Sequence, residues 1–81
     1  MTPEEIFSKL QELIAEQFAL NQDEITMASS FTDDLGADSV DLVELVMAME
    51  EEFALDEIEE DDLAQLKTVG DCVKYLSSKI N

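Results

Sequence analysis

Hydrophobic residues recur every three or four positions over residues 3–18, which is the spacing of one face of an α-helix. Thr2 precedes this pattern as a helix cap, Pro3 suits the first helical position, and Glu5 completes a capping box. The pattern predicts a first helix whose buried face consists of Ile6, Leu10, Leu13, Ile14 and Phe18.

The strongest helical pattern lies at residues 38–53. Gly36 marks a turn before it, Asp38 is the predicted cap, and Asp41 stands at the third helical position, where a capping-box acid belongs. At about 100° per residue, one side of this helix gathers the predicted core residues Leu42, Leu45, Val46, Met49 and Phe53.

Two further helices are predicted near the C-terminus. The acidic segment 59–66 carries only Leu63 and Leu66 as apolar anchors and predicts a helix of one to two turns. Residues 68–80 predict a longer helix, with Thr68 as cap, Asp71 at the third helical position, and an apolar stripe of Val69, Cys72, Val73, Leu76 and Ile80.

Residues 19–37 show no sustained period and predict an ordered loop. Its apolar side chains are expected to anchor it on the core; they are Ile25, Met27, Phe31 and Leu35. A loop of this length in so small a domain is typically functional or a linker. The predicted fold is all-α: one domain over residues 1–81, a small up-down bundle of three main helices plus a short third helix, with a long loop between the first two.

The helix at 38–53 carries a second apolar stripe, formed by Val40, Val43 and Met47, roughly 140° from its core face. Glutamates flank this stripe at positions 44, 50 and 51. Scattered surface hydrophobes are common in folded proteins. The alternative is a docking stripe, an apolar centre with a carboxylate rim that suits a basic partner in a transient complex.

The charge narrows the classes of partner. Twenty-one acidic residues against four basic ones give a net charge of −17, which excludes nucleic acid and disfavours anionic membranes. Basic protein surfaces remain as partners. The acidic N-terminus does not resemble a leader, and the lone Cys72, predicted to be buried and inert, fits a reducing compartment, so we expect a cytoplasmic protein.

Ser39 stands at the predicted start of a helix, between Asp38 and Asp41. A serine nucleophile needs an adjacent base, and the chain has no histidine and no lysine nearby in the sequence, so we expect no enzyme activity. Ser39 is therefore either structural or a substrate for another enzyme. The acidic runs 50–52 and 59–62 lack EF-hand spacing, so no dedicated metal site is expected.

The stretch DDLGADSVDLVELVMAMEEEF resembles the acyl carrier proteins of dissociated fatty-acid synthesis, which carry D-S-L in the context L-G-A-D-S-L-D, then V-E-L-V-M. The resemblance implies that Ser39 bears 4′-phosphopantetheine, transferred from coenzyme A, and that acyl chains ride on it as thioesters. It also implies partner docking through Asp38, Val40, Asp41, Val43, Glu44, Met47, Glu50 and Glu51. The chain departs from the family at Val40 (usually Leu), at Ala19 (often Gly) and around the 54–59 loop.

The implied partners are a phosphopantetheinyl transferase (holo-carrier synthase), a malonyl transferase, a ketosynthase, a ketoreductase, a dehydratase, an enoyl reductase and acyltransferases, all with basic docking patches, acting on a monomeric carrier. A carrier of a specialised polyketide or lipid acyl-transfer pathway has the same motif. From a different class, an acidic interaction protein that competes for basic partners would fit the charge, but it gives Ser39 no role.

A carried acyl chain is predicted to shelter in an expandable core. The short, highly charged helix at 59–66 has few apolar anchors and should be the easiest element to displace. The predicted lining residues are Phe31, Val46, Met49, Ile58, Leu63 and Leu66.

Overall fold

Helices make up the regular structure of residues 2–80, which the computed structural model describes, with Glu60 described by its backbone only. The elements are α1 (Pro3–Phe18), the 3₁₀ helix η1 (Gln22–Glu24), α2 (Ser39–Glu52), α3 (Glu60–Leu63) and α4 (Val69–Ile80). Within these residues β-pairing is limited to an isolated bridge between Ser30 and Thr68. The all-α prediction is confirmed, with η1 as an additional element and α3 reduced to one turn.

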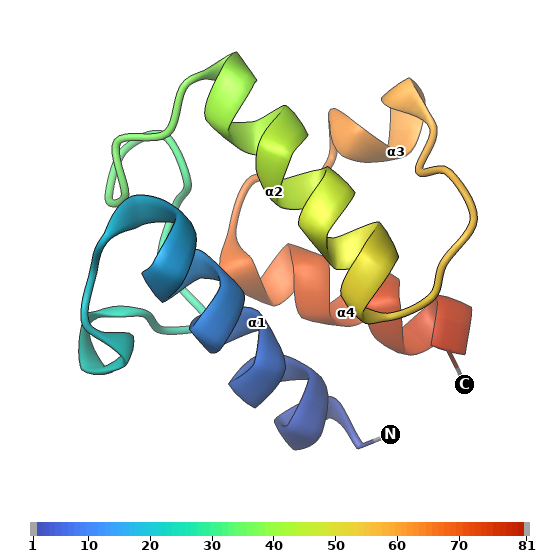
Figure 1. Cartoon of the computed structure of the whole chain (residues 1–81), viewed down its shortest axis with the longest axis horizontal. Coiled ribbons are helices and arrows are strands. Elements are labelled where there is room, and N and C mark those ends of the chain that lie inside the picture. Colours follow the sequence, from blue (N-terminus) through green and yellow to red (C-terminus); the bar gives the residue numbers. More distant parts are fainter. Residues whose placement is uncertain (1, 81) are drawn as a thin grey trace.

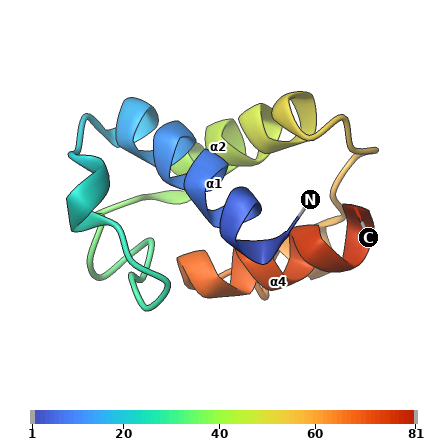
Figure 2. The ribbon, with the colours of Figure 1, turned by 90° about the horizontal axis from the view of Figure 1, so that it is seen from below.

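Of the three long helices, α2 and α4 both pack against α1. Figures 1 and 2 show α1 running antiparallel to both α2 and α4, while the short α3 lies beside α2 at the edge of the molecule. The backbone of α1 closely approaches those of α2 and α4. Within the described part of the chain, α3 makes no comparably close backbone approach to another helix. The rigid part of the fold is therefore built on α1, and α3 is attached through side chains and loops.

Short-range capping sets where α1 and α4 begin. The Thr2 hydroxyl accepts the Glu5 N–H at 3.2 Å, and the Glu5 carboxylate accepts the Thr2 N–H at 3.0 Å. Thr68 and Asp71 form the same reciprocal pair, at 3.1 Å in both directions. Accepting backbone N–H bonds lowers the pKa of both the Glu5 and the Asp71 carboxyl groups. Both predicted helix starts are confirmed.

The core contains the predicted apolar faces of the long helices. The fully buried large side chains are Ile6, Leu10, Ile14, Ile25, Phe31, Leu45, Met49, Val69, Cys72 and Leu76. Other predicted core residues are half-buried around this centre; they are Leu13, Phe18, Leu35, Leu42, Phe53 and Ile80. The outcome is one contiguous hydrophobic cluster to which all three long helices and the long loop contribute.

The prediction that Met27 is a core anchor is wrong, because 46% of this residue is exposed. Its backbone is the anchor instead: the Met27 carbonyl accepts the Gly70 N–H at 2.8 Å. A Cβ on Gly70 would lie 2.9 Å from that carbonyl oxygen, so the contact depends on glycine at position 70. The loop thus caps the first turn of α4 with its main chain and leaves the methionine side chain facing solvent.

The loop before α2 is tied to the connection between α3 and α4. Phe31 donates its N–H to the Lys67 carbonyl at 3.1 Å, and Val69 donates to the Ser29 carbonyl at 3.0 Å. Phe31 in turn accepts the Ala37 N–H at 2.7 Å. Gly36 has a φ of +68°, a conformation that favours glycine, and it turns the chain into α2. These bonds fix the position of the residue that begins α2.

Candidate functional site

Ser39 is the first residue of α2 and its side chain is exposed. The preceding residue, Asp38, accepts the Asp41 N–H at 2.9 Å, and the Asp41 carboxylate accepts the Asp38 N–H at 3.2 Å. The predicted capping box is confirmed. It directs both aspartate side chains to backbone groups and leaves the serine hydroxyl open to solvent.

The first turn of α2 keeps two unused donors beside Ser39. The Asp38 and Asp41 N–H groups are occupied by the capping box, and the Leu42 N–H bonds to the Asp38 carbonyl at 3.0 Å. Within residues 2–80 the N–H groups of Ser39 and Val40 make no hydrogen bond. They lie at the positive end of the helix dipole, where a phosphate group is favoured. A phosphoester on the Ser39 hydroxyl therefore fits this position.

Among the residues that the structure describes, no base is hydrogen-bonded to Ser39. The chain has no histidine, and the Ser39 hydroxyl makes no hydrogen bond with the part of the chain that the structure describes. Of the lysines, Lys9 pairs with Glu52 at 3.2 Å and Lys79 lies over the Tyr75 ring. The geometry suits a hydroxyl that another enzyme modifies.

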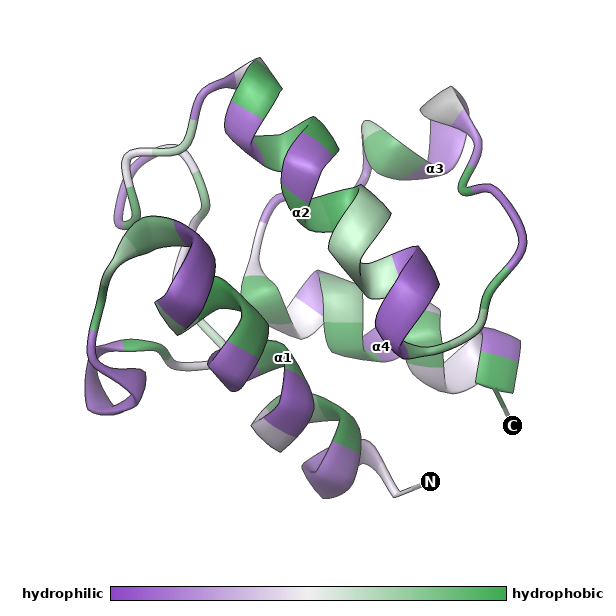
Figure 3. Cartoon of the chain, viewed as in Figure 1, coloured by the Kyte–Doolittle hydropathy of each residue, from purple (hydrophilic) through white to green (hydrophobic). Residues whose placement is uncertain are grey.

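The second stripe of α2 lies at the surface, as predicted. The exposed fractions are 63% for Val40, 47% for Val43 and 61% for Met47. Figure 3 shows hydrophobic and hydrophilic bands alternating along α2. Below, the term α2 face means these three side chains together with the neighbouring carboxylates, which are Asp38, Asp41, Glu44, Glu50 and Glu51.

The carboxylates of the α2 face differ in what holds them. Glu44 accepts a hydrogen bond from the Gln17 amide of α1 at 2.7 Å. Glu50 is half-buried and accepts the backbone N–H of Ile58 at 2.7 Å. Glu51 is exposed, and its side chain makes no hydrogen bond or ion pair with the described residues. Only Glu51 among these three glutamates is therefore free to meet a partner without breaking an internal bond.

An apolar hollow of about 450 Å³ opens between the start of α2 and α3. It is lined by Ser30, Phe31, Thr32, Asp33, Leu42, Leu63, Ala64, Leu66 and Lys67. Phe31, Leu63 and Leu66 were predicted as pocket residues. Val46, Met49 and Ile58 belong to the core cluster and do not line this hollow.

Leu42 and Ala64 line the hollow but were not predicted as pocket residues. The helical pattern predicts Leu42 on the core face, because hydropathy does not distinguish a core position from a cavity wall. Its spacing carried a usable signal, however. Leu42 follows Ser39 by three residues, so the two side chains are neighbours on the helix surface.

Cys72 is buried, as predicted, and burial raises the pKa of its thiol to about 12, with a further contribution from the charge of Asp71. The described side chains contain no group of three or more acidic, cysteine or histidine residues arranged to hold a metal ion. The acidic run 59–62 is covered only in part, because the side chain of Glu60 lies outside the described residues. None of the described helices has the length and apolar character that crossing a membrane requires.

Comparison with known proteins gives a consistent result. The profile of the phosphopantetheine attachment site family matches residues 8–76. The chain is 56% identical over 72 residues to the acyl carrier protein of Clostridium perfringens, covering 89% of this chain and 93% of that protein. It is 47% identical to the acyl carrier protein of Petrotoga mobilis, covering 100% of this chain and 94% of that one. A solved structure of an acyl carrier protein from Enterococcus faecalis superposes with a TM-score of 0.80 at 35% identity, covering 98% of this chain and 99% of that one.

Proposed function

The chain belongs to the acyl carrier protein family, and we propose that Ser39 is the residue to which its 4′-phosphopantetheine arm is attached. The protein carries acyl chains on this arm in fatty-acid synthesis. The observation that supports the assignment is the exposed Ser39 hydroxyl at the start of α2, beside the two unused N–H donors of Ser39 and Val40.

The proposed attachment assigns a separate task to each part of the α2 start. During loading, the Ser39 hydroxyl oxygen would bond to the pantetheine-side phosphorus of coenzyme A as the pyrophosphate bond breaks. The hydroxyl proton would pass to the transferase, and adenosine 3′,5′-bisphosphate would leave. The N–H groups of Ser39 and Val40 would then be available to the phosphate of the arm. Asp38 and Asp41 hold the helix end in place through the capping box. The arm supplies a terminal thiol that carries the acyl group as a thioester. We assign no catalytic residue to the chain itself, and residues 1–81 act as one carrier domain.

Loading the chain with coenzyme A and a phosphopantetheinyl transferase is expected to add one arm and one reactive thiol. Cys72 should stay unreactive in the folded protein, because a thiol with a pKa near 12 has almost no thiolate at pH 8. Intact mass and titration with a thiol reagent measure both quantities. A wild-type chain that gains no arm with several transferases, or that gains mass without a new reactive thiol, contradicts the proposal.

We propose further that the α2 face docks the basic surfaces of the enzymes that load and use the carrier. Its apolar centre of Val40, Val43 and Met47 and its acidic rim are complementary to a cationic patch with an apolar middle. The net charge of −17 would speed such encounters at low salt. Asp38, Asp41, Glu44 and Glu50 belong to the rim by position, although their carboxylates already hold internal bonds.

Reversing the charge of Glu51 is expected to slow docking several-fold at low ionic strength without altering the fold, since its side chain has no internal bond. The loading rate of the transferase, measured against salt for Glu51→Lys, tests this. Asp23→Lys is the matched control, because it makes the same charge change on η1, away from α2 (Figure 1). Equal slowing of both variants would mean that net charge alone, and not the α2 face, guides the partner.

A further inference from the structure

Glu50 makes an unusual contact for a surface glutamate, because it bonds to the backbone of a different segment. Its carboxylate reaches from the last turn of α2 to the N–H of Ile58, at 2.7 Å. Glu50 is half-buried, and the Ile58 side chain is buried in the core. A charged acceptor makes a stronger hydrogen bond than a neutral one. The contact therefore fixes the middle of the connection between α2 and α3.

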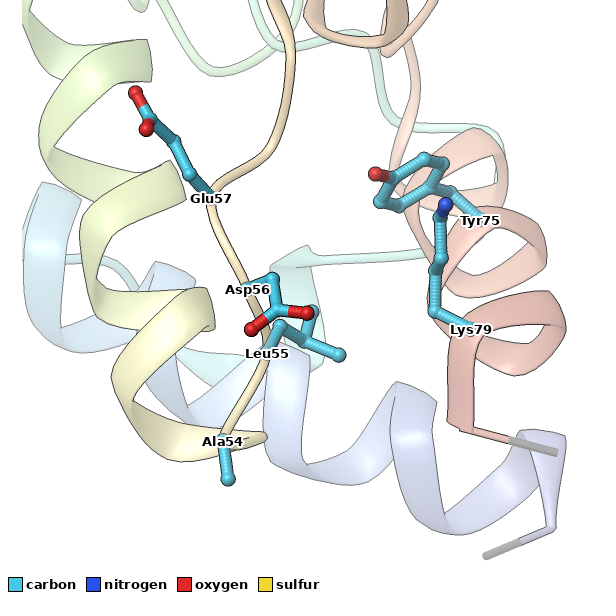
Figure 4. A pocket seen from close by; sticks show the side chains of 6 residues that line it. All are labelled: Ala54, Leu55, Asp56, Glu57, Tyr75 and Lys79. Carbon is cyan, nitrogen blue, oxygen red and sulfur yellow. The ribbon is translucent and has the colours of Figure 1, made fainter.

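Residues 55–63, which comprise this connection and α3, are called the lid. Within the described residues, the N–H groups of Asp56, Glu57 and Glu59 make no hydrogen bond. On the α4 side, a hollow of about 230 Å³ separates segment 54–57 from Tyr75 and Lys79 (Figure 4). The connection thus has open space beside it. In the part that the structure describes, its bonds to the helices include the Glu50 carboxylate and a backbone bond from the Leu55 N–H to the Glu50 carbonyl at 2.9 Å.

The α3 end of the lid is also lightly held. Asp62 accepts a hydrogen bond from the Tyr75 hydroxyl of α4 at 3.3 Å. Leu63, at the end of α3, is only half-buried, whereas Leu66 beyond it is buried. Within the described residues, the lid is therefore held to the bundle by two bonds to Glu50 of α2, one of them from the Leu55 N–H to the Glu50 carbonyl at 2.9 Å, by one bond from α4, and by a few apolar side chains.

We propose that Glu50 is a positioning residue of the lid: its carboxylate holds Ile58, and through it the lid, against α2. In consequence, Glu50 and Glu51 have different tasks although they are adjacent in sequence. Glu51 serves the α2 face, and Glu50 holds in place the lid, whose Leu63 lines the apolar hollow. A role of the lid in sheltering an acyl chain rests on the proposed function. The contact between Glu50 and Ile58, called the clasp below, is a property of the unloaded protein.

Amide hydrogen exchange of the unloaded chain tests the clasp separately from the carrier function. In Glu50→Ala, the amides of Ile58 and Leu63, which are bonded to Glu50 and to the Glu59 carbonyl, should exchange about tenfold faster than in wild type, because a hydrogen bond to a charged group is lost. Glu51→Ala removes the same charge and should not speed the exchange of these amides. Loss of a negative charge by itself reduces self-repulsion, which would slow exchange and not speed it.

Glu50→Gln separates the hydrogen bond from the charge. Glutamine keeps an acceptor oxygen at the same reach, so most of the protection of Ile58 should return. Amides of α1 serve as the internal control and should not change in any variant. Unchanged exchange at Ile58 in Glu50→Ala, or equal exchange in the glutamine and alanine variants, would overturn the proposal. Failure of arm attachment would overturn only the proposed function.

Discussion

The Ser39→Ala variant is expected to accept no 4′-phosphopantetheine, whereas the wild-type chain accepts one arm. The ester requires a hydroxyl oxygen, and alanine has none. Exposure alone does not make an acceptor, because other serines and threonines of the chain are also exposed. Ser39 differs from them in standing first in a long helix, beside two unused N–H donors and next to the α2 face. The expected effect is therefore complete loss, measured by intact mass after incubation with coenzyme A and a transferase.

The variant should keep the fold, which makes its loss of loading interpretable. The Ser39 hydroxyl makes no hydrogen bond within residues 2–80, and the helix cap is supplied by Asp38. Helicity should match wild type. The free energy of unfolding, measured by thermal melting, should change by no more than roughly a few tenths of a kcal/mol, as for other surface substitutions. Ser8→Ala, an exposed change on α1, is the control and should load normally. An arm found on Ser39→Ala would remove Ser39 as the attachment site.

The starts of the helices were predictable because their causes are local. Each capping box joins residues three apart, as in Thr2 with Glu5 and Asp38 with Asp41. No tertiary contact is needed to form such a pair, so the sequence shows it directly. Ser39 could be proposed as the attachment residue from the sequence because the family motif that it resembles consists of its immediate sequence neighbours.

Features that depend on contacts between distant segments could not be predicted. Met27 has the hydropathy of an anchor, yet the loop docks through its carbonyl on Gly70, and the side chain is left outside. Glu44 and Glu50 have the same charge and belong to the same helix as Glu51. Their bonds to Gln17 and Ile58 exist only because α1 and the lid lie beside α2 in the fold. A helical wheel therefore shows which glutamates lie on one side of α2, but it does not show which of them are bonded to other segments of the fold.

Acylation of the arm is expected to raise the melting temperature with the length of the chain, because the apolar hollow gives it cover beside Ser39. Leu42, one turn after Ser39, lines this hollow together with Leu63 and Leu66. Each buried methylene contributes up to about 0.8 kcal/mol. Binding only to the folded state stabilises it. A net gain of about 1 kcal/mol corresponds to roughly 4–8 °C in a domain of this size.

Matched melting curves of the holo, short-chain and medium-chain forms measure this dependence, and a filled hollow tests where the chain lies. Ala64→Phe places a ring in the hollow, so the rise with chain length should shrink or vanish. Ala28→Phe adds the same ring at an exposed loop position outside the hollow, and the rise should persist. Equal melting temperatures for all acyl forms of the wild type would mean that the chain stays in solvent. A full rise in Ala64→Phe would place the chain elsewhere, leaving the hollow between α2 and α3 without this role.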